Sequence, residues 1–131
     1  MNTKRSIPTF EAKIYVGFRK AYSQDLDFVK AISTARETCA EAVKDGWCVT
    51  LQPIEYIYTP TFTLGQAEPV SGEPGAVIGA INYPRFPTKP EDLKVKCIEL
   101  ASKLMERLEQ QRVTVVFTDE TVLLEHVSAV N

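Results

Sequence analysis

Residues 10–19 read Phe-Glu-Ala-Lys-Ile-Tyr-Val-Gly-Phe-Arg. Apolar residues occupy every second position of this stretch, from Phe10 to Phe18, and mostly polar residues occupy the positions between them. A period of two is typical of a strand that has one buried and one exposed face. The stretch therefore predicts the first strand of a sheet that packs one of its faces against a core.

The rest of the chain adds helices and strands in a regular order. Apolar stripes at helical spacing predict one helix between Ser23 and Gly46 and another from Thr88 to about Glu109. Four further strands are expected at 47–58, 76–83, 113–118 and 121–127. This βαββαβ order with a short extra C-terminal strand predicts an α+β fold. It is the ferredoxin-like sandwich, with one antiparallel sheet and two helices on one face.

A single domain is expected to take up most of the 131 residues. Residues 1–9 are expected to form a flexible N-terminal arm, residues 10–127 the ferredoxin-like domain, and residues 128–131 a C-terminal tail. Segment 59–74, which is rich in Pro, Gly and Thr, is read as a long loop between strands two and three. Long loops in small domains are often functional, so this one is expected to contact a partner.

The second predicted strand changes its phase. Its apolar residues fall at odd positions up to Leu51 and at even positions from Ile54 onward. A shift of one residue at Gln52-Pro53 predicts a bulge there, and proline within a strand favours the edge of a sheet.

Composition gives little indication of a partner. The net charge is −2, which lacks the basic footprint of a nucleic-acid-binding protein. Cys39, Cys48 and Cys97 have no metal-ligand spacing and are expected to be buried, reduced thiols, so neither a metal nor a cofactor is predicted. No signal peptide or membrane span is recognisable, which predicts a cytoplasmic protein.

The third and fourth predicted strands suggest self-association. Residues 76–81 and 113–117 are apolar with little alternation, so both faces of the sheet are expected to be covered. A second copy of the chain is the expected cover, in a homo-oligomer for which a trimer is favoured and a dimer comes second. The alternative cover is the long loop with the chain termini. The interface candidates are Tyr58, Phe62, Leu64 and Tyr15.

Cationic and aromatic residues follow the strands. Strands 10–19 and 76–83 are expected to be central, adjacent and parallel. Their carboxyl ends should therefore meet where both helices begin, at the end of the sheet opposite segment 59–74. Helix amino-termini attract anions, so a small anionic ligand is predicted at this corner. The alternative is a rim of solvated cationic side chains. The candidate ligand-binding residues are Arg19, Lys20, Tyr22, Asn82, Tyr83, Arg85 and Arg112.

No catalytic motif is recognisable, and the single histidine, His126, lies near the C-terminus. No catalytic residue is therefore assigned. The sequence favours a non-enzymatic binding or regulatory module for a small anionic ligand or a protein partner. The alternative is a small enzyme, a hydrolase or an isomerase, that acts at the corner of Arg19 and Arg85.

Two resemblances bear on function. Residues 14–17, Ile-Tyr-Val-Gly, resemble the first-strand signature of RNA-recognition motifs, which implies that Tyr15 stacks on a base, so an RNA-binding domain is the second alternative. The Lys/Arg-Gly-aromatic signature of that family is absent from residues 75–80. The two halves, the long segment 59–74 and the short last strand resemble PII-like and CutA-like trimeric proteins. That resemblance implies a trimer whose long loop responds to an effector or contacts a partner.

Overall fold

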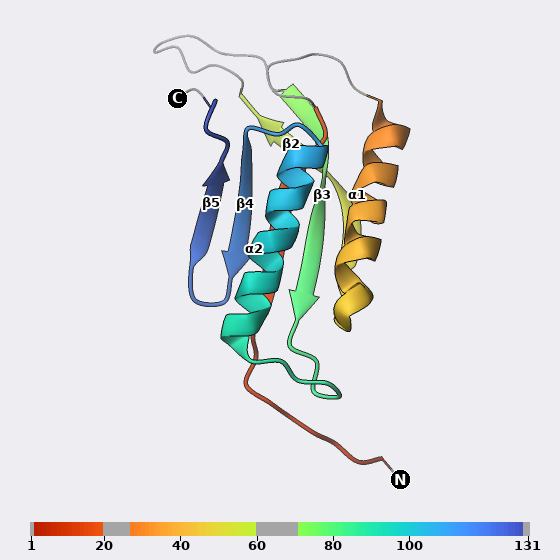
Figure 1. The fold of residues 1–131 in the computed structure, drawn as a ribbon, viewed down its shortest axis with the longest axis vertical. Helices are drawn as coiled ribbons and strands as arrows, with labels where there is room; N and C mark the ends of the chain where they lie inside the picture. The colour runs from red at the N-terminus through yellow and green to blue at the C-terminus, as the bar shows by residue number, and fades with distance from the viewer. Residues whose placement is uncertain (1, 20–26, 60–70, 130–131) are drawn as a thin grey trace.

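The computed structural model describes residues 2–19, 27–59 and 71–129. Figure 1 shows two helices packed on one face of a single sheet. This arrangement confirms the ferredoxin-like α+β prediction. In chain order the elements are β1 (Glu11–Gly17), α1 (Phe28–Ala42), the 3-10 turn η1 (Val43–Asp45), β2 (Thr50–Tyr58), β3 (Ser71–Ile81), α2 (Pro90–Arg107), β4 (Arg112–Phe117) and β5 (Thr121–Glu125).

The strands lie in the order β2-β3-β1-β4-β5, and every neighbouring pair is antiparallel. The expected parallel pairing of the first and third strands was therefore wrong. The crossover through α1 makes β1 and β2 parallel, and β3 runs back between them, so β3 must oppose both of its neighbours. In the view of Figure 1, β3 points down, whereas the N-terminal segment leads into β1 from below.

The core lies between the sheet and the two helices. Alternate residues of the central strands point toward the helices and are almost fully buried, including Ile14, Ile78 and Val115. They pack with the apolar stripe of α2, in which Leu100 and Leu104 are also buried. Each such side chain contributes about 1.5–3 kcal/mol when it leaves water. The alternation predicted for residues 10–19 is observed, with Tyr15 on the face away from the helices.

β2 is an edge strand, as predicted, but it has no bulge. Its pairing with β3 continues without interruption from Thr50 opposite Gly79 to Tyr58 opposite Ser71. Leu51 lies opposite the core residue Ile78 and faces the helices, whereas Tyr56 lies opposite Glu73 on the other face of the sheet. The change of phase in the sequence is therefore not a bulge. The apolar residues before Pro53 lie on the helix side of β2, those after it lie mainly on the other side, and the backbone pairing is continuous.

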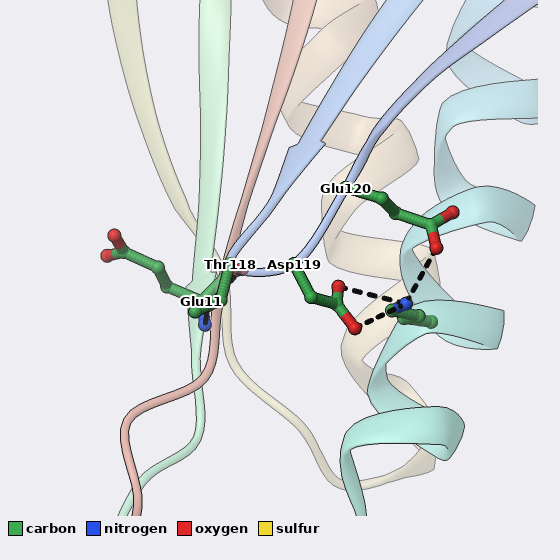
Figure 2. A network of polar contacts seen from close by, with 5 residues as sticks. Glu11, Thr118, Asp119 and Glu120 are labelled. Atoms are coloured by element: carbon green, nitrogen blue, oxygen red, sulfur yellow. Dashed lines mark hydrogen bonds and ion pairs between the residues drawn. The ribbon is translucent and has the colours of Figure 1, made fainter.

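Lys94 of α2 forms ion pairs with Asp119 and Glu120, two residues labelled in Figure 2 that lie between β4 and β5. Its Nζ lies 2.9 Å from a carboxylate oxygen of Asp119 and 3.1 Å from Oε2 of Glu120. The hydrogen bonds that it donates to these two carboxylates raise the pKa of Lys94. Beside them, the backbone N–H of Glu11 donates to Oγ1 of Thr118 at 2.9 Å. These contacts close the end of the sheet where β1 begins.

Two kinds of feature, a membrane-spanning helix and a cluster of metal ligands, are not found among the described residues. None of the described helices has the length and apolar character needed to cross a membrane. Within residues 2–19, 27–59 and 71–129, no group of three or more His, Cys, Asp or Glu side chains is arranged to hold a metal ion.

Candidate functional site

The antiparallel pairing divides the predicted anion-binding residues between the two ends of the sheet. Arg19 and Arg112 lie at the end where Gly17 pairs with Gly75. The group of Asn82, Tyr83 and Arg85 follows β3 at the other end, about 20 Å away along the strands. The expected convergence of these residues was therefore wrong, because it depended on parallel strands. Two further candidates, Lys20 and Tyr22, lie outside the described residues.

The second group shapes the turn that leads into α2. Oδ1 of Asn82 accepts a hydrogen bond from the backbone N–H of Thr88 at 2.8 Å, and the rings of Tyr83 and Phe86 lie 5.1 Å apart. The thiol of Cys48 donates to the Tyr83 hydroxyl at 3.5 Å, and this contact raises the pKa of Tyr83. Cys48 is exposed, so its predicted burial was wrong. A ligand-binding role for this group stays a prediction.

A cleft of about 600 Å³ opens at the other end of the sheet, where β1 ends. It lies on the face that the helices leave uncovered, and four strands and the segment after α2 contribute to it. Segment 59–74 was expected at the end opposite Arg19, but its described flanks, Tyr58 and Ser71, lie at this same end. The lining residues are Tyr15, Gly17, Tyr56, Ile57, Tyr58, Glu73, Gln110, Arg112, Thr114 and Val116.

Gly17, which lines the cleft, is paired with a second glycine that is buried. Gly17 of β1 lies opposite Gly75 of β3. A Cβ atom on Gly75 would lie 2.5 Å from the carbonyl oxygen of Val16 and 2.7 Å from Cε2 of Tyr56. The Tyr56 ring therefore lies directly against the backbone of Gly75, at a distance that only glycine permits.

Glu73 is the acidic side chain of the cleft. The Tyr58 hydroxyl donates to its Oε2 at 3.4 Å, and its Oε1 lies 2.9 Å from the place that a Cβ on Gly17 would take. The cationic lining residue Arg112 is paired with Glu125, which lies outside the lining, at 3.0 Å. With the arginine so compensated, the carboxylate and the electron-rich ring faces favour a cationic group in the cleft.

Tyr56 can serve the cleft only as a neutral phenol. Burial, followed by the negative charge of Glu73 and the nearby Tyr15, raises its pKa to about 12. The phenol therefore keeps its proton at neutral pH and can donate a hydrogen bond, but it cannot act as a general base.

The sequence-based candidates covered part of this lining. Arg112 was predicted as a ligand-binding residue, and Tyr15 and Tyr58 as interface residues, whereas Tyr56 and Glu73 were missed. The available signal was the alternation within β2. Tyr56 and Tyr58 share one face of this strand, and Leu51, which faces the helices, lies on the other. The other interface candidates, Phe62 and Leu64, lie outside the described residues. Self-association through these residues stays a prediction.

The fold is a ferredoxin-like α+β sandwich, and the open face of its sheet carries a cleft whose volume is in the usual range for small-molecule sites. No protein-family model matches the chain, and no curated protein sequence matches it. A phage SAM lyase in its apo state matches with a TM-score of 0.72 and 18% identity, over 98% of this chain and 99% of that one. A phage SAM lyase in complex with S-methyl-5'-thioadenosine matches with a TM-score of 0.72 and 16% identity, over 98% of each chain.

These matches correct two expectations. The resemblance to PII-like and CutA-like proteins was wrong, because the full-length structural similarity is to phage SAM lyases. The preference for a non-enzymatic module with an anionic ligand was wrong on the same grounds, since those proteins are named as enzymes and the bound nucleoside of one is uncharged. The alternative reading, a small enzyme, agrees better with these matches.

Proposed function

We propose that this chain is an enzyme that cleaves S-adenosylmethionine and releases S-methyl-5'-thioadenosine. One observation carries the proposal: the fold shared over 98% of the chain with a phage SAM lyase includes a cleft that joins aromatic rings to a carboxylate. The substrate has a matching combination of groups, namely a planar adenine and a positively charged sulfonium.

The size and lining of the cleft support the nucleoside part of the substrate. A volume of about 600 Å³ lies within the usual range for small-molecule sites. The rings of Tyr15, Tyr56 and Tyr58 line it, and flat aromatic faces suit the stacking of a base. The Tyr56 ring rests on the backbone of Gly75, which fixes the place of this ring in the cleft.

The electrostatics of the cleft support the sulfonium. The Glu73 carboxylate and the ring faces attract a cation. Because the Tyr56 phenol stays neutral, it adds no second negative charge to the site. The arrangement thus favours a substrate with one localised positive charge beside an aromatic base.

The reaction can be written without a general base. The carboxylate oxygen of the substrate attacks its own Cγ, the Cγ–S bond breaks, and the electron pair of that bond remains on sulfur. The products are the neutral thioether and a homoserine lactone, and no proton or water is consumed. The attack is intramolecular, so the cleft needs only to hold the carboxylate close to Cγ and in line with the C–S bond. Opposite charges disappear as the bond forms, so a partly desolvated cleft favours the step.

The test is a product analysis with purified protein. We expect catalytic amounts of the chain to convert S-adenosylmethionine to S-methyl-5'-thioadenosine and homoserine lactone, as measured by liquid chromatography and mass spectrometry. If no thioether forms above the spontaneous rate, the proposed function is wrong.

An isotope experiment separates this lyase reaction from hydrolysis. In H2¹⁸O, direct attack of water on Cγ places the label in the hydroxyl group of homoserine. Lactone formation followed by ring opening at the acyl carbon places it in the carboxyl group. Label in the hydroxyl group would replace the lyase with a hydrolase.

A further inference from the structure

Gln110 enters the cleft from a strained turn. After α2 ends, Glu109 takes a left-handed backbone conformation with φ of 53°, which is uncommon for a residue other than glycine. The next residue, Gln110, donates its backbone N–H to the carbonyl of Met105 at 2.9 Å and lines the cleft with its side chain. The turn therefore does more than end the helix, because it also places an amide at the substrate site.

Two hydrogen bonds fix the orientation of this amide. Nε2 of Gln110 donates to the carbonyl oxygen of Arg19 and to that of Leu108, the latter at 3.0 Å. A flipped amide would set its own oxygen against these two acceptors. The favoured orientation leaves Oε1 toward the cleft, 3.0 Å from the place that a Cβ on Gly17 would take.

Glu73 also lies close to the position that a Cβ on Gly17 would take. Its Oε1 lies 2.9 Å from that position above Gly17. Two hydrogen-bond acceptors, one charged and one neutral, therefore come together over Gly17, where a side chain would collide with both of them. Converging acceptors favour a group of positive charge over a neutral one.

We infer that Gln110 is a specificity-determining residue, whose fixed carbonyl oxygen acts with Glu73 to distinguish the sulfonium of the substrate from the neutral thioether of the product. This inference rests on the proposed function. Cleavage removes the positive charge from sulfur, so the acceptor pair loses its attraction at the moment when the product must leave. The contribution of Gln110 to this discrimination is expected to be about tenfold in affinity.

The test compares two ligands that differ by one methyl group and one charge. S-methyl-5'-thioadenosine is neutral, and its S-methylated dimethylsulfonium derivative is cationic and lacks the four-carbon chain, so it cannot undergo the reaction. Both affinities are measured by isothermal titration calorimetry. We expect wild type to bind the sulfonium more tightly, and Gln110→Met to reduce the ratio of the two affinities about tenfold while the thioether affinity is retained.

Controls separate specificity from folding. Gln52→Met makes the same substitution at an exposed position of β2 outside the cleft and should leave the ratio unchanged. Equal loss of both affinities in Gln110→Met, or an unchanged ratio, overturns the inference even if wild type cleaves S-adenosylmethionine. The absence of cleavage by wild type overturns the proposed function instead, and it is measured separately.

Discussion

Tyr56 and Glu73 lie directly opposite each other in the β2–β3 ladder, and both side chains line the cleft on the open face of the sheet. The ladder thus fixes an aromatic ring and a carboxylate side by side. The Tyr56 ring rests on Gly75, and the carboxylate reaches over Gly17. The antiparallel register and the two glycines together allow this arrangement of ring and carboxylate.

The first prediction concerns the charge of the cleft. Glu73→Gln keeps the shape of the side chain but removes the negative charge that favours the sulfonium. We expect kcat/KM for cleavage of S-adenosylmethionine to fall about 100-fold, while the thermal midpoint stays close to that of wild type.

The matched control for Glu73→Gln is Glu55→Gln. Glu55 lies on the neighbouring strand opposite Pro74, is exposed, and does not line the cleft. The Glu55→Gln variant should therefore retain the kcat/KM of wild type. Equal losses of kcat/KM in the two variants would show that the general negative charge of β2 and β3, and not the position of Glu73 in the cleft, determines the activity.

The second prediction concerns Gly75, against which the Tyr56 ring packs. In Gly75→Ala the new methyl group would lie 2.5 Å from the carbonyl oxygen of Val16 and 2.7 Å from the Tyr56 ring, so the backbone and the ring must both move. We expect a loss of about 2–3 kcal/mol in the free energy of unfolding, measured by urea denaturation, together with weaker binding of S-methyl-5'-thioadenosine.

Gly79→Ala on the same strand is the comparison for Gly75→Ala. Its methyl group would meet only Oγ1 of Thr50, at 2.8 Å, and an exposed threonine side chain can rotate away. The loss should therefore be clearly smaller. Similar losses at the two positions would contradict the close packing of Tyr56 on Gly75.

The third prediction concerns the thiols. Cys48 is exposed, whereas Cys39 and Cys97 are buried, and burial raises their pKa values to about 11 and about 12. At pH 8 a disulfide reagent such as DTNB should modify one thiol rapidly and the other two only after denaturation. The rapid phase should be lost in Cys48→Ser. Simultaneous reaction of all three thiols in native protein would contradict the burial.

The fourth prediction concerns stability at alkaline pH. In the folded chain Cys39 and Cys97 hold their protons well above the ordinary thiol pKa of 9.0, so only the unfolded state ionises as the pH first rises above 9. Unfolding then releases protons, and the free energy of unfolding falls with rising pH by about 1.4 kcal/mol per unit for each group. The fall should end for each thiol near its folded-state pKa.

Denaturation in urea at a series of pH values from 7 to 10.5 measures this fall. Cys97→Ala lowers stability at every pH because it leaves a cavity, but it should also make the pH dependence shallower. An unchanged dependence in this variant would contradict the assignment to Cys97.

The sequence predicted the parts of the fold that depend on local periodicity. The alternation around Ile14 predicted β1, and the stripe from Leu93 to Leu104 predicted α2 with the buried face that is observed. It also predicted β2 as an edge strand from Pro53. These succeeded because a period of two or 3.6 residues is written in the chain itself.

The candidate site was predicted only in part. Arg112 was selected, but it was grouped with Asn82, Tyr83 and Arg85, which lie at the far end of the sheet. Glu73 was read as part of a loop, although it is a residue of β3. The direction of β3 decided both outcomes, and no local pattern records whether a strand runs with or against its neighbour.

By itself, the sequence determined the elements, their order and their buried faces, because these follow from the spacing of apolar side chains. Only the tertiary structure decided which residues meet on the open face. Hydrogen bonding between distant strands sets the register, and the register places Tyr56 opposite Glu73 and Gly17 opposite Gly75. A cleft built from such pairs exists only after the strands have been aligned.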